Sequence, residues 1–346
     1  MKVLFYSARP YDRDPMQTAN AGQHQLEFIE ERLDEKTVVL AQGYDAVCGF
    51  VNDDFSAPVL HALAGVGVRL VLLRCTGFNN VDLAAAAAEK ISVMRVPHYS
   101  PYAVAEFAVT LMLSLSRKIH RSYNKVREDN FLLDGLLGFD LHGKTVGVVG
   151  TGKIGRVLTR ILNGFGCIVL AFDACEDSGC KESGVRYMPL MDLLSAADIV
   201  SLHLPLTPET HHIMDNRALA AMKSGAMLIN TSRGGLINTT ALVQALKSRH
   251  LGAAGLDVYE GEGDLFFRDL SGQIMQDDVF ARLLTFPNVI VTGHQAFFTQ
   301  EALRDIARTT FQSIDDFIAE RQSANGLDAS SALARMTPLT NSSDER

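Results

Sequence analysis

The sequence contains little that would suit an extracellular or membrane-spanning protein. It has no Cys-x-x-Cys motif, and its cysteines are odd in number, namely Cys48, Cys75, Cys167, Cys175 and Cys180. That pattern predicts free thiols in a reducing compartment, without a disulfide framework or a cysteine zinc site. The most apolar long stretch, 103–115, contains Glu106 and is too short to cross a bilayer. The start of the chain lacks the apolar run of a secretion signal. We therefore expect a cytoplasmic protein without membrane contact.

A broad basic surface is also missing. The net charge is -8, and the only basic cluster lies within 117–127, where a helix would present it to solvent or to another subunit. A nucleic-acid footprint needs a wider basic face, so we expect no nucleic-acid partner. With 346 residues, of which 47% are hydrophobic, the chain is long enough for two domains with substantial cores.

Short apolar runs alternate with helical patterns in two blocks of the chain. In the first block the runs 3–6, 46–50, 69–75 and 91–96 predict strands, as does 37–40, while the spacing over 23–33 predicts a helix. A single long helix is expected from Ser100 to about Glu128. The second block has strand-like runs at 145–149, 168–172, 199–202, 226–230, 253–258 and 289–292. Such alternation predicts an α/β protein with parallel sheets covered by helices.

A glycine-rich turn follows the first strand of the second block. The segment VGVVGTGKIG places Gly150, Gly152 and Gly155 between a strand and a helix, and Asp173 ends the next strand. Gly150 permits a tight turn, Gly152 lets the backbone approach a pyrophosphate, and Gly155 lets the helix pack closely. Asp173 would accept the ribose hydroxyls and repel a 2′-phosphate, which favours NAD over NADP. The alternative is a glycine turn in an α/β domain that binds no ligand.

Three charged or ionisable residues follow later strands of the same block: Arg233, Glu262 and His294. Taken singly, Arg233 suits a surface ion pair, Glu262 a solvated loop, and His294 a structural role. Because the strands of a parallel sheet end at one edge, the three side chains can converge beside a bound dinucleotide. Arginine binds a carboxylate with two donors, and histidine supplies a proton near neutral pH. A carboxylate fixes the imidazole tautomer. The trio therefore indicates hydride transfer to a 2-keto acid, and the glycines beside Arg233 would make room for its anionic end.

These residues, in this order, resemble the D-isomer-specific 2-hydroxyacid dehydrogenases over nearly the whole chain. The motifs are VGVVGTGKIG, LHLPLTPET, NTSRGGLI, GLDVYEGEGDLFF and TGHQAFFT, while RCTGFNNVD, VPHYSPYAVAEFA and the segment 264–280 resemble the fermentative D-lactate dehydrogenase branch. The resemblance implies a Rossmann NAD domain, 101–298, inserted into a flavodoxin-like substrate domain, 1–100 plus 299–346. It implies that Arg233, Glu262 and His294 are catalytic, with His294 as the acid/base. It also implies a homo-oligomer, a dimer or a tetramer.

The resemblance also implies ligand contacts. Besides the three glycines, the cofactor contacts would be Lys153, Ile154, Asp173, Leu204, Pro205, Thr210, Thr231, Ser232 and Asp257. Asp257 would hold the nicotinamide carboxamide, and His203, Leu204 and Pro205 would flank the adenosine. Backbone amides near Thr76, Gly77 and Phe78 would meet the substrate carboxylate.

From the residues alone, several aromatic side chains could line a small apolar pocket. They include Tyr99 and Tyr102, for which core packing is the alternative. No metal site is expected, since adjacent residues such as His211 and His212 point apart in regular structure.

The function these observations favour is an NAD-dependent D-lactate dehydrogenase acting on pyruvate. Two alternatives stay open. One is a dehydrogenase for a larger D-2-hydroxyacid or for glycerate. The other is a nucleotide-sensing binding protein of the kind found among transcriptional corepressors, since such relatives of this fold can keep the same trio.

Overall fold

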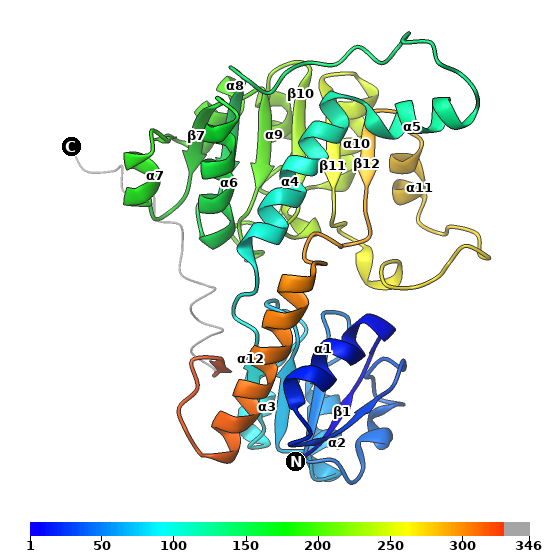
Figure 1. Cartoon of the computed structure of the whole chain (residues 1–346), viewed down its shortest axis with the longest axis vertical. Coiled ribbons are helices and arrows are strands. Elements are labelled where there is room, and N and C mark those ends of the chain that lie inside the picture. The colour runs from blue at the N-terminus through cyan, green and yellow to red at the C-terminus, as the bar shows by residue number, and fades with distance from the viewer. Residues whose placement is uncertain (329–346) are drawn as a thin grey trace. The chain divides into compact units, whose positions relative to one another are not determined.

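The computed structural model describes residues 1–328, which form two compact units (Figure 1). The terminal unit contains Met1–Ser100 and the described residues from Phe298 onward, and the middle unit contains Pro101–Phe297. Residues 329–346, which belong to the predicted substrate domain, lie outside the described residues.

The terminal unit is built on a six-stranded sheet with the order β13-β5-β4-β3-β1-β2. All strands are parallel except β13, which pairs antiparallel with β5. The strands are β1 (Lys2–Phe5), β2 (Gln25–Phe28), β3 (Ala46–Gly49), β4 (Leu70–Leu73), β5 (Ser92–Arg95) and β13 (Gly326–Leu327). The helices are α1 (Pro10–Asn20), η1 (Val38–Ala41), α2 (Ala57–Gly65), α3 (Leu83–Ala88) and α12 (Gln300–Ile318). The order of the five parallel strands is that of a flavodoxin-like sheet.

The middle unit is built on a seven-stranded, fully parallel sheet with the order β12-β11-β10-β9-β6-β7-β8. The strands are β6 (Thr145–Val149), β7 (Ile168–Phe172), β8 (Arg186–Tyr187), β9 (Ile199–Leu202), β10 (Ala226–Asn230), β11 (Leu251–Leu256) and β12 (Val289–Val291). The chain order reverses between β6 and β9, and ligands of such sheets bind beyond the strand ends at this point. The predicted fold class, doubly wound parallel sheets of Rossmann and flavodoxin-like type, is confirmed.

Helices cover both faces of the sheet in the middle unit. They are α4 (Pro101–Ser116), α5 (Ile119–Arg127), α6 (Lys153–Gly164), α7 (Ser178–Glu182), α8 (Leu190–Ala196), α9 (Asn216–Ala221), η2 (Gly234–Leu236), α10 (Thr239–Lys247), η3 (Glu262–Asp264) and α11 (Asp278–Leu284). Val146 and Val148 of β6 pack with side chains of α4 and α6, whereas Leu228 of β10 packs with those of α8 to α10. Because successive side chains of a strand point to opposite faces, strands buried on both faces are apolar throughout.

Two elements of the terminal unit differ from the prediction. The prediction of a helix over 23–33 is wrong, because 25–28 forms the edge strand β2. The side chains of β2 alternate between exposed and half-buried positions. The strand expected at 37–40 is wrong too, because the segment forms the 3₁₀ helix η1. The side chain of Asp34 accepts hydrogen bonds from the backbone N–H groups of Lys36 and Thr37, which turns the chain at that point.

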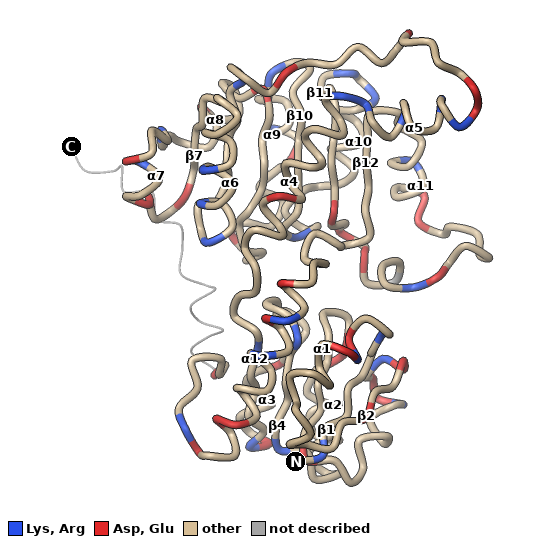
Figure 2. Tube along the Cα trace, in the orientation of Figure 1, with Lys and Arg blue, Asp and Glu red and all other residues tan. Residues whose placement is uncertain are grey.

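The single long helix expected from residue 100 to 128 is interrupted. It ends as α4 at Ser116 and resumes as α5 after Lys118, whose φ is 52°. The returning chain explains the break, since Phe139 N–H donates to the carbonyl of Ser116 and a Cβ on Gly138 would lie 2.2 Å from that oxygen. α5 buries none of its residues, as expected for the basic cluster, and Lys and Arg do not gather into one broad face in Figure 2.

Within residues 1–328, no helix is both long enough and apolar enough to cross a bilayer.

Candidate active site

Glu262 and His294 are brought together in the middle unit by two neighbouring strands. Glu262 lies in the turn after β11, and His294 lies in the turn after β12. His294 Nδ1 is 3.0 Å from Glu262 Oε1, and Glu262 Oε2 accepts a hydrogen bond of 3.0 Å from Tyr259 N–H. The turn holds His294 with a φ of 56°, and its N–H donates to the carbonyl of Asp257. A backbone N–H therefore fixes the carboxylate, and the carboxylate in turn holds the imidazole.

This geometry leaves one imidazole nitrogen available. With Nδ1 facing the carboxylate, Nε2 of His294 makes no hydrogen bond to any residue of the described part of the chain. The side chains of His294 and Glu262 are only 15% and 18% exposed. A carboxylate at Nδ1 sets the tautomer and stabilises the imidazolium, so Nε2 is the atom suited to exchange a proton with a ligand.

Asp257 anchors the turn that carries His294. Its carboxylate is fully buried and accepts hydrogen bonds from Thr292 Oγ1 (2.6 Å), Gln295 N–H (2.8 Å) and Ala296 N–H (2.8 Å). Burial raises the pKa of Asp257, although these hydrogen bonds act to lower it. From the sequence, Asp257 is expected only to contact the cofactor, and its anchoring role is not predicted. An acidic residue directly after the buried strand β11 was the available signal, since a buried carboxylate needs partners.

Arg233 follows β10, the next strand of the sheet. Asn230 fixes its turn, accepting from Ser232 N–H at 3.0 Å and donating to the carbonyl of Arg233 at 2.9 Å. The half-buried guanidinium donates to the carbonyl of Ser232 at 2.7 Å. Within the described residues, no hydrogen bond or ion pair joins Arg233 to Glu262 or His294. The structure thus joins two members of the predicted trio by contact and places the third at the end of the adjacent strand.

The glycines after Arg233 do not make room for a ligand, and that part of the prediction is wrong. A Cβ on Gly234 would lie 2.0 Å from the carbonyl carbon of Tyr259 and 2.4 Å from the nitrogen of Glu260. Gly235 faces the side chains of Leu206 and His211. These glycines therefore let the turn after β10 pack against neighbouring turns, including the one that supplies Glu262.

Each glycine of the turn after β6 has a separate spatial role. Gly150 has a φ of 100°, and a Cβ there would lie 2.7 Å from the carbonyl carbon of His203. A Cβ on Gly155 would lie 2.0 Å from the carbonyl oxygen of Gly150, so only glycine lets α6 pack this closely. Gly152, by contrast, has open space where its Cβ would be. That space, at the residue before α6, suits the approach of a phosphate to a helix N-terminus.

Lys153 and Ile154 open α6, and Ile154 packs partly buried against the core. Asp173 lies at the end of β7. Its Oδ2 accepts hydrogen bonds from Thr151 N–H (2.6 Å) and Thr151 Oγ1 (3.1 Å), and its Oδ1 accepts from Cys175 N–H (3.0 Å). The carboxylate is thus tied to the glycine turn, a link that the sequence spacing did not reveal. Further acceptor capacity remains on Oδ1, because each carboxylate oxygen has two lone pairs and Oδ2 already accepts two hydrogen bonds.

The turns after β9 and β10 are linked to each other. Ser232 Oγ donates to the carbonyl of Leu204 at 2.6 Å, and Thr210 Oγ1 donates to the carbonyl of Pro205 at 2.7 Å. Two buried polar atoms here have no hydrogen-bond partner among residues 1–328, namely Thr231 Oγ1 and His203 Nδ1. Burial lowers the pKa of His203 to about 4, so its ring is neutral near pH 7. Unpaired buried polar atoms are rare and call for a ligand or water. They fit a polar cofactor lying along these turns.

The predicted substrate contacts of the terminal unit follow β4. The N–H groups of Thr76 and Gly77 make no hydrogen bond within the described residues, whereas the carbonyl of Thr76 accepts from Arg95 at 2.8 Å. The ring of Phe78 lies 4.7 Å from the Arg95 guanidinium. Tyr99 is half-buried there.

Tyr102 belongs to the middle unit, where its hydroxyl faces Arg160 Nη1 at 3.4 Å.

Two further expectations are decided by the structure. The five cysteines are free, as predicted. The expectation that His211 and His212 point apart is wrong, because their rings stack with centroids 3.8 Å apart. His212 has a φ of 53°, so the pair does not lie in regular structure.

Comparison with known proteins agrees with this geometry. The model of the family "D-isomer specific 2-hydroxyacid dehydrogenase, NAD binding domain" matches residues 109–296, which confirms NAD as the cofactor. The 2-hydroxyacid dehydrogenase homolog 1 of Schizosaccharomyces pombe is 51% identical over 92% of this chain and 97% of its own length. The D-lactate dehydrogenase of Escherichia coli is 50% identical over 91% of this chain and 96% of its own.

Among solved structures, that of the pyruvate reductase of Chlamydomonas reinhardtii superposes with a TM-score of 0.90 at 44% identity, covering 94% of this chain and 98% of that one. The chain therefore belongs to the D-isomer specific 2-hydroxyacid dehydrogenase family and is an NAD-dependent oxidoreductase.

Proposed function

We propose that this enzyme is a D-lactate dehydrogenase, which interconverts pyruvate and D-lactate. The observation that carries the proposal is the Glu262–His294 pair, whose imidazole keeps Nε2 available in the unit with the dinucleotide fingerprint. Relatives at about half identity over most of the chain include enzymes named D-lactate dehydrogenase, from Escherichia coli and from Curvularia clavata.

The proposed roles follow from the chemistry of a keto-acid reduction. When bound, reduced NAD supplies the hydride to the carbonyl carbon. His294 Nε2 gives a proton to the carbonyl oxygen, and Glu262 stabilises the positive imidazole that precedes this transfer. Arg233 binds the carboxylate through two parallel hydrogen bonds and polarises the carbonyl oxygen. In the oxidation direction, the neutral imidazole accepts the hydroxyl proton.

We also propose that the unbonded N–H groups of Thr76 and Gly77 bind the substrate carboxylate. Two adjacent amide donors without a partner suit an anion. Tyr99 and Tyr102 are proposed to limit the size of the substrate, which favours pyruvate over longer keto acids. Phe78 would contribute its N–H from the same turn as Thr76 and Gly77.

The cofactor contacts are proposed on the same grounds. The open space at Gly152 and the start of α6, with Lys153 and Ile154, would take the pyrophosphate. Asp173 would accept the ribose hydroxyls. The unpaired hydroxyl of Thr231 and the loop residues Leu204, Pro205, Thr210 and Ser232 would lie along the dinucleotide. Asp257 would add a nicotinamide contact to its anchoring of the His294 turn.

The test is a set of steady-state rates. Oxidation of NADH should be measured with pyruvate, glyoxylate, hydroxypyruvate, 2-ketobutyrate and 2-ketoisocaproate, and the product from pyruvate should be assigned as D or L. We expect the highest kcat/KM with pyruvate and a D product. A clear preference for 2-ketoisocaproate or hydroxypyruvate would support the alternatives of a larger D-2-hydroxyacid or glycerate. Binding of NADH without turnover of any keto acid would support the corepressor-like alternative.

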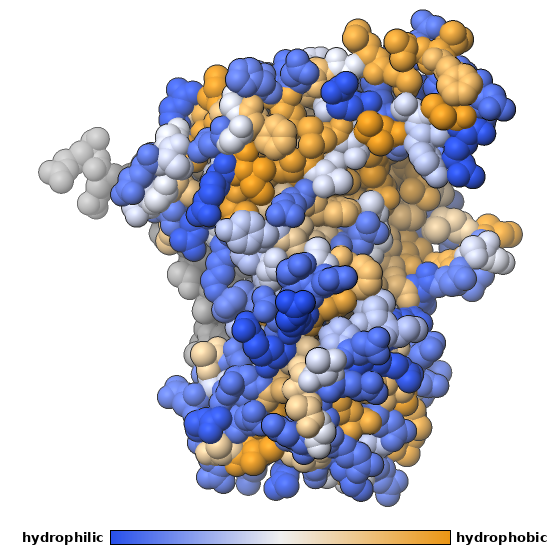
Figure 3. Space-filling view, viewed as in Figure 1, coloured by the Kyte–Doolittle hydropathy of each residue, from blue (hydrophilic) through white to orange (hydrophobic). Residues whose placement is uncertain are grey.

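We further propose that the enzyme is a homo-oligomer, a dimer or a tetramer, and that it works in the cytoplasm, where free thiols persist. Large apolar side chains are exposed on α5 and on the segment that follows it, residues 128–144, which we call the arm. They are Ile119, Tyr123, Val126, Phe131, Leu132, Leu133 and Leu137. They gather at the upper right of Figure 3. Lys118 Nζ donates to the carbonyl of Gly135, and Lys125 Nζ donates to the carbonyls of Leu132 and Asp134. These hydrogen bonds hold the backbone of the arm in place. An exposed apolar patch of this kind marks an interaction site, for which we propose a second copy of the chain.

Light scattering coupled to gel filtration tests the oligomer. We expect the wild type to exceed the monomer mass, and the double variant L133D/L137D to shift toward the monomer. A monomeric wild type would contradict the proposal.

A further inference from the structure

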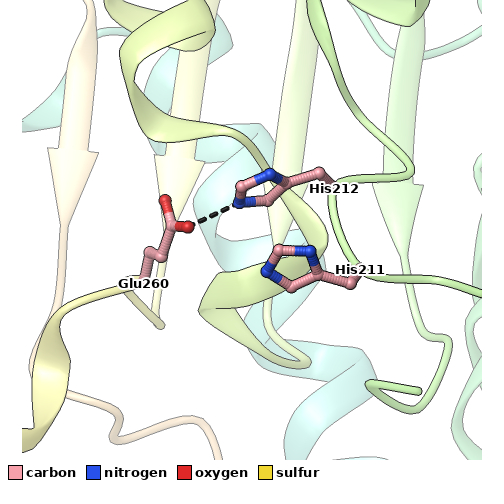
Figure 4. A group of neighbouring side chains, drawn as sticks. All are labelled: His211, His212 and Glu260. Atoms are coloured by element: carbon pink, nitrogen blue, oxygen red, sulfur yellow. Dashed lines mark hydrogen bonds and ion pairs between the residues drawn. The ribbon is translucent and has the colours of Figure 1, made fainter. Parts of the chain in front are cut away.

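His211, His212 and Glu260 form a cluster that the proposed reaction does not use. One ligand atom from each lies within 4.8 Å of the others (Figure 4). The two histidines come from the loop between β9 and α9, and Glu260 comes from the turn after β11. The cluster therefore joins two loops that are separated by more than forty residues in the sequence.

The local backbone aims both imidazoles at the same side. His212 adopts a φ of 53°, and its N–H donates to the carbonyl of Gly235 at 2.8 Å. Its ring stacks on that of His211 with an interplanar angle of 26°. Gly235 lies close to the ring of His211, since a Cβ on this glycine would be 3.6 Å from Cδ2 of His211. Adjacent residues in regular structure would not present two rings in this way.

Glu260 is held in place from its other side. Oε1 lies 2.5 Å from His212 Nε2, while Oε2 accepts hydrogen bonds from Thr239 Oγ1 (3.0 Å) and Thr239 N–H (3.3 Å). The carboxylate is therefore oriented by a neighbouring hydroxyl, as metal-binding carboxylates are.

We propose that His211, His212 and Glu260 bind a divalent transition-metal ion such as Zn²⁺, Ni²⁺ or Co²⁺. Two imidazoles and one carboxylate suit these ions better than Mg²⁺ or Ca²⁺, which prefer oxygen ligands alone. Three protein ligands leave a position for water.

Only a small movement is needed to form the site. Metal–ligand bonds of about 2.1 Å place neighbouring ligand atoms roughly 3.3 Å apart. His212 Nε2 and Glu260 Oε1, which are 2.5 Å apart, therefore have to separate slightly, while His211 moves toward them. The ring of His211 is exposed and makes no hydrogen bond within the described residues, so it can rotate at little cost.

An ordinary ion pair does not account for the whole arrangement. Glu260 and His212 alone would satisfy one another, yet His211 is stacked beside them with its ring nitrogens unused. An ion shared by the three side chains uses both imidazoles and links the loop that contains Thr210 to the turn that contains Glu262. Binding to the folded chain alone would raise its thermal stability. This inference does not depend on which keto acid is reduced.

The test uses the full chain without a histidine tag, after removal of metal with EDTA and dialysis. Calorimetric titration with NiCl₂ and ZnSO₄, and the visible spectrum with CoCl₂, should each give one ion per chain. The thermal midpoint should rise with either metal and should not rise with MgCl₂.

His211→Ala should weaken the affinity by about 10-fold or more, because it removes a ligand. His61→Ala is the matched control. His61 also pairs with a glutamate, Glu89, at 2.8 Å, but has no second histidine beside it. His61→Ala should bind metal as the wild type does.

Two results would overturn the proposal: a wild type without a stoichiometric site, or equal affinity in the wild type and in His211→Ala. If His211→Ala does not fold, His211→Gln and the Co²⁺ spectrum of the wild type decide the question. An imidazole-ligated Co²⁺ spectrum supports the site, and a spectrum of hydrated Co²⁺ contradicts it.

Discussion

Glu260 and Glu262 lie two residues apart in the turn after β11, and each carboxylate holds a histidine from a different loop. Glu262 faces Nδ1 of His294 at 3.0 Å, whereas Glu260 faces Nε2 of His212 at 2.5 Å. The side chains of the first pair are 18% and 15% exposed, and those of the second are 35% and 27% exposed. The two pairs thus share residue types and a hydrogen bond, but differ in the nitrogen used and in their access to water.

That difference separates a pair suited to proton transfer from a pair suited to holding loops. In the Glu262–His294 pair, Nε2 is left without a protein partner in a partly enclosed setting. In the Glu260–His212 pair, Nε2 is occupied, the second carboxylate oxygen binds Thr239, and the imidazole stacks on His211. A Glu–His pair therefore has no fixed role, and its role depends on which imidazole nitrogen remains available and on what surrounds it.

The largest effect is expected from His294→Ala. Removing the group that we propose exchanges the proton should lower kcat for pyruvate reduction by about 10²-fold or more, the usual contribution of a general acid. His61→Ala, which removes an exposed histidine that is also paired with a glutamate, should leave kcat unchanged. Steady-state rates of NADH oxidation measure both. Near-normal turnover in His294→Ala would remove the distinction between the two pairs.

Arg233→Lys sharpens the comparison, because Arg233 makes no hydrogen bond or ion pair with either pair in the described residues. An ammonium group cannot form the two parallel hydrogen bonds of a guanidinium. Loss of one charge-assisted bond, about 1.5–3 kcal/mol, should lower kcat/KM for pyruvate by roughly 10- to 100-fold. KM should rise and kcat should fall together. An unchanged KM would contradict the carboxylate role.

Glu262→Gln tests the charge of the first pair. Glutamine can keep one of the two hydrogen bonds of Glu262, but it loses the negative charge that stabilises the positive imidazole. We expect kcat for reduction to fall about tenfold. Steady-state rates of NADH oxidation with pyruvate measure the fall, and a kcat equal to that of the wild type would argue against a role for the charge of Glu262.

The glycine turn and the alternation of strands and helices could be predicted because their signals are local. Gly155 faces the backbone of Gly150, five residues earlier in the same strand-turn-helix unit, so spacing alone indicates its role, whereas the backbone that Gly150 faces, at His203, lies in another loop. Arg233, Glu262 and His294 could be placed at one sheet edge because every strand of the middle unit is parallel. Position after a strand was enough to group them, although it did not reveal which of them touch.

Features set by contacts between distant segments could not be predicted. Asp257 receives its hydrogen bonds from residues 35 to 39 positions away, and the sequence gives no sign of that partnership. The stacking of His211 on His212 depends on a left-handed residue and on the carbonyl of Gly235, neither of which has a periodic signal. Gly234 was misread for the same reason, since the backbone it accommodates, at Tyr259 and Glu260, lies in another loop. The edge strand β2 is only half-buried, so its apolar residues were too few to separate a strand from a helix.

Glu260→Gln should have the smallest effect, and it should lower the stability of the fold more than the rate of catalysis. The amide can replace the carboxylate toward either His212 or Thr239, but it cannot accept from both. Losing one such bond should lower the free energy of unfolding by about 1 kcal/mol, less where solvent screens it. Urea unfolding of the metal-free chain measures the loss, and Glu209→Gln is the control, because Glu209 is exposed in the loop before His211. The fall in kcat should be much smaller than that of Glu262→Gln. If the two glutamine variants lost kcat equally, the two pairs would share one role, and the separation between proton transfer and loop anchoring would be wrong.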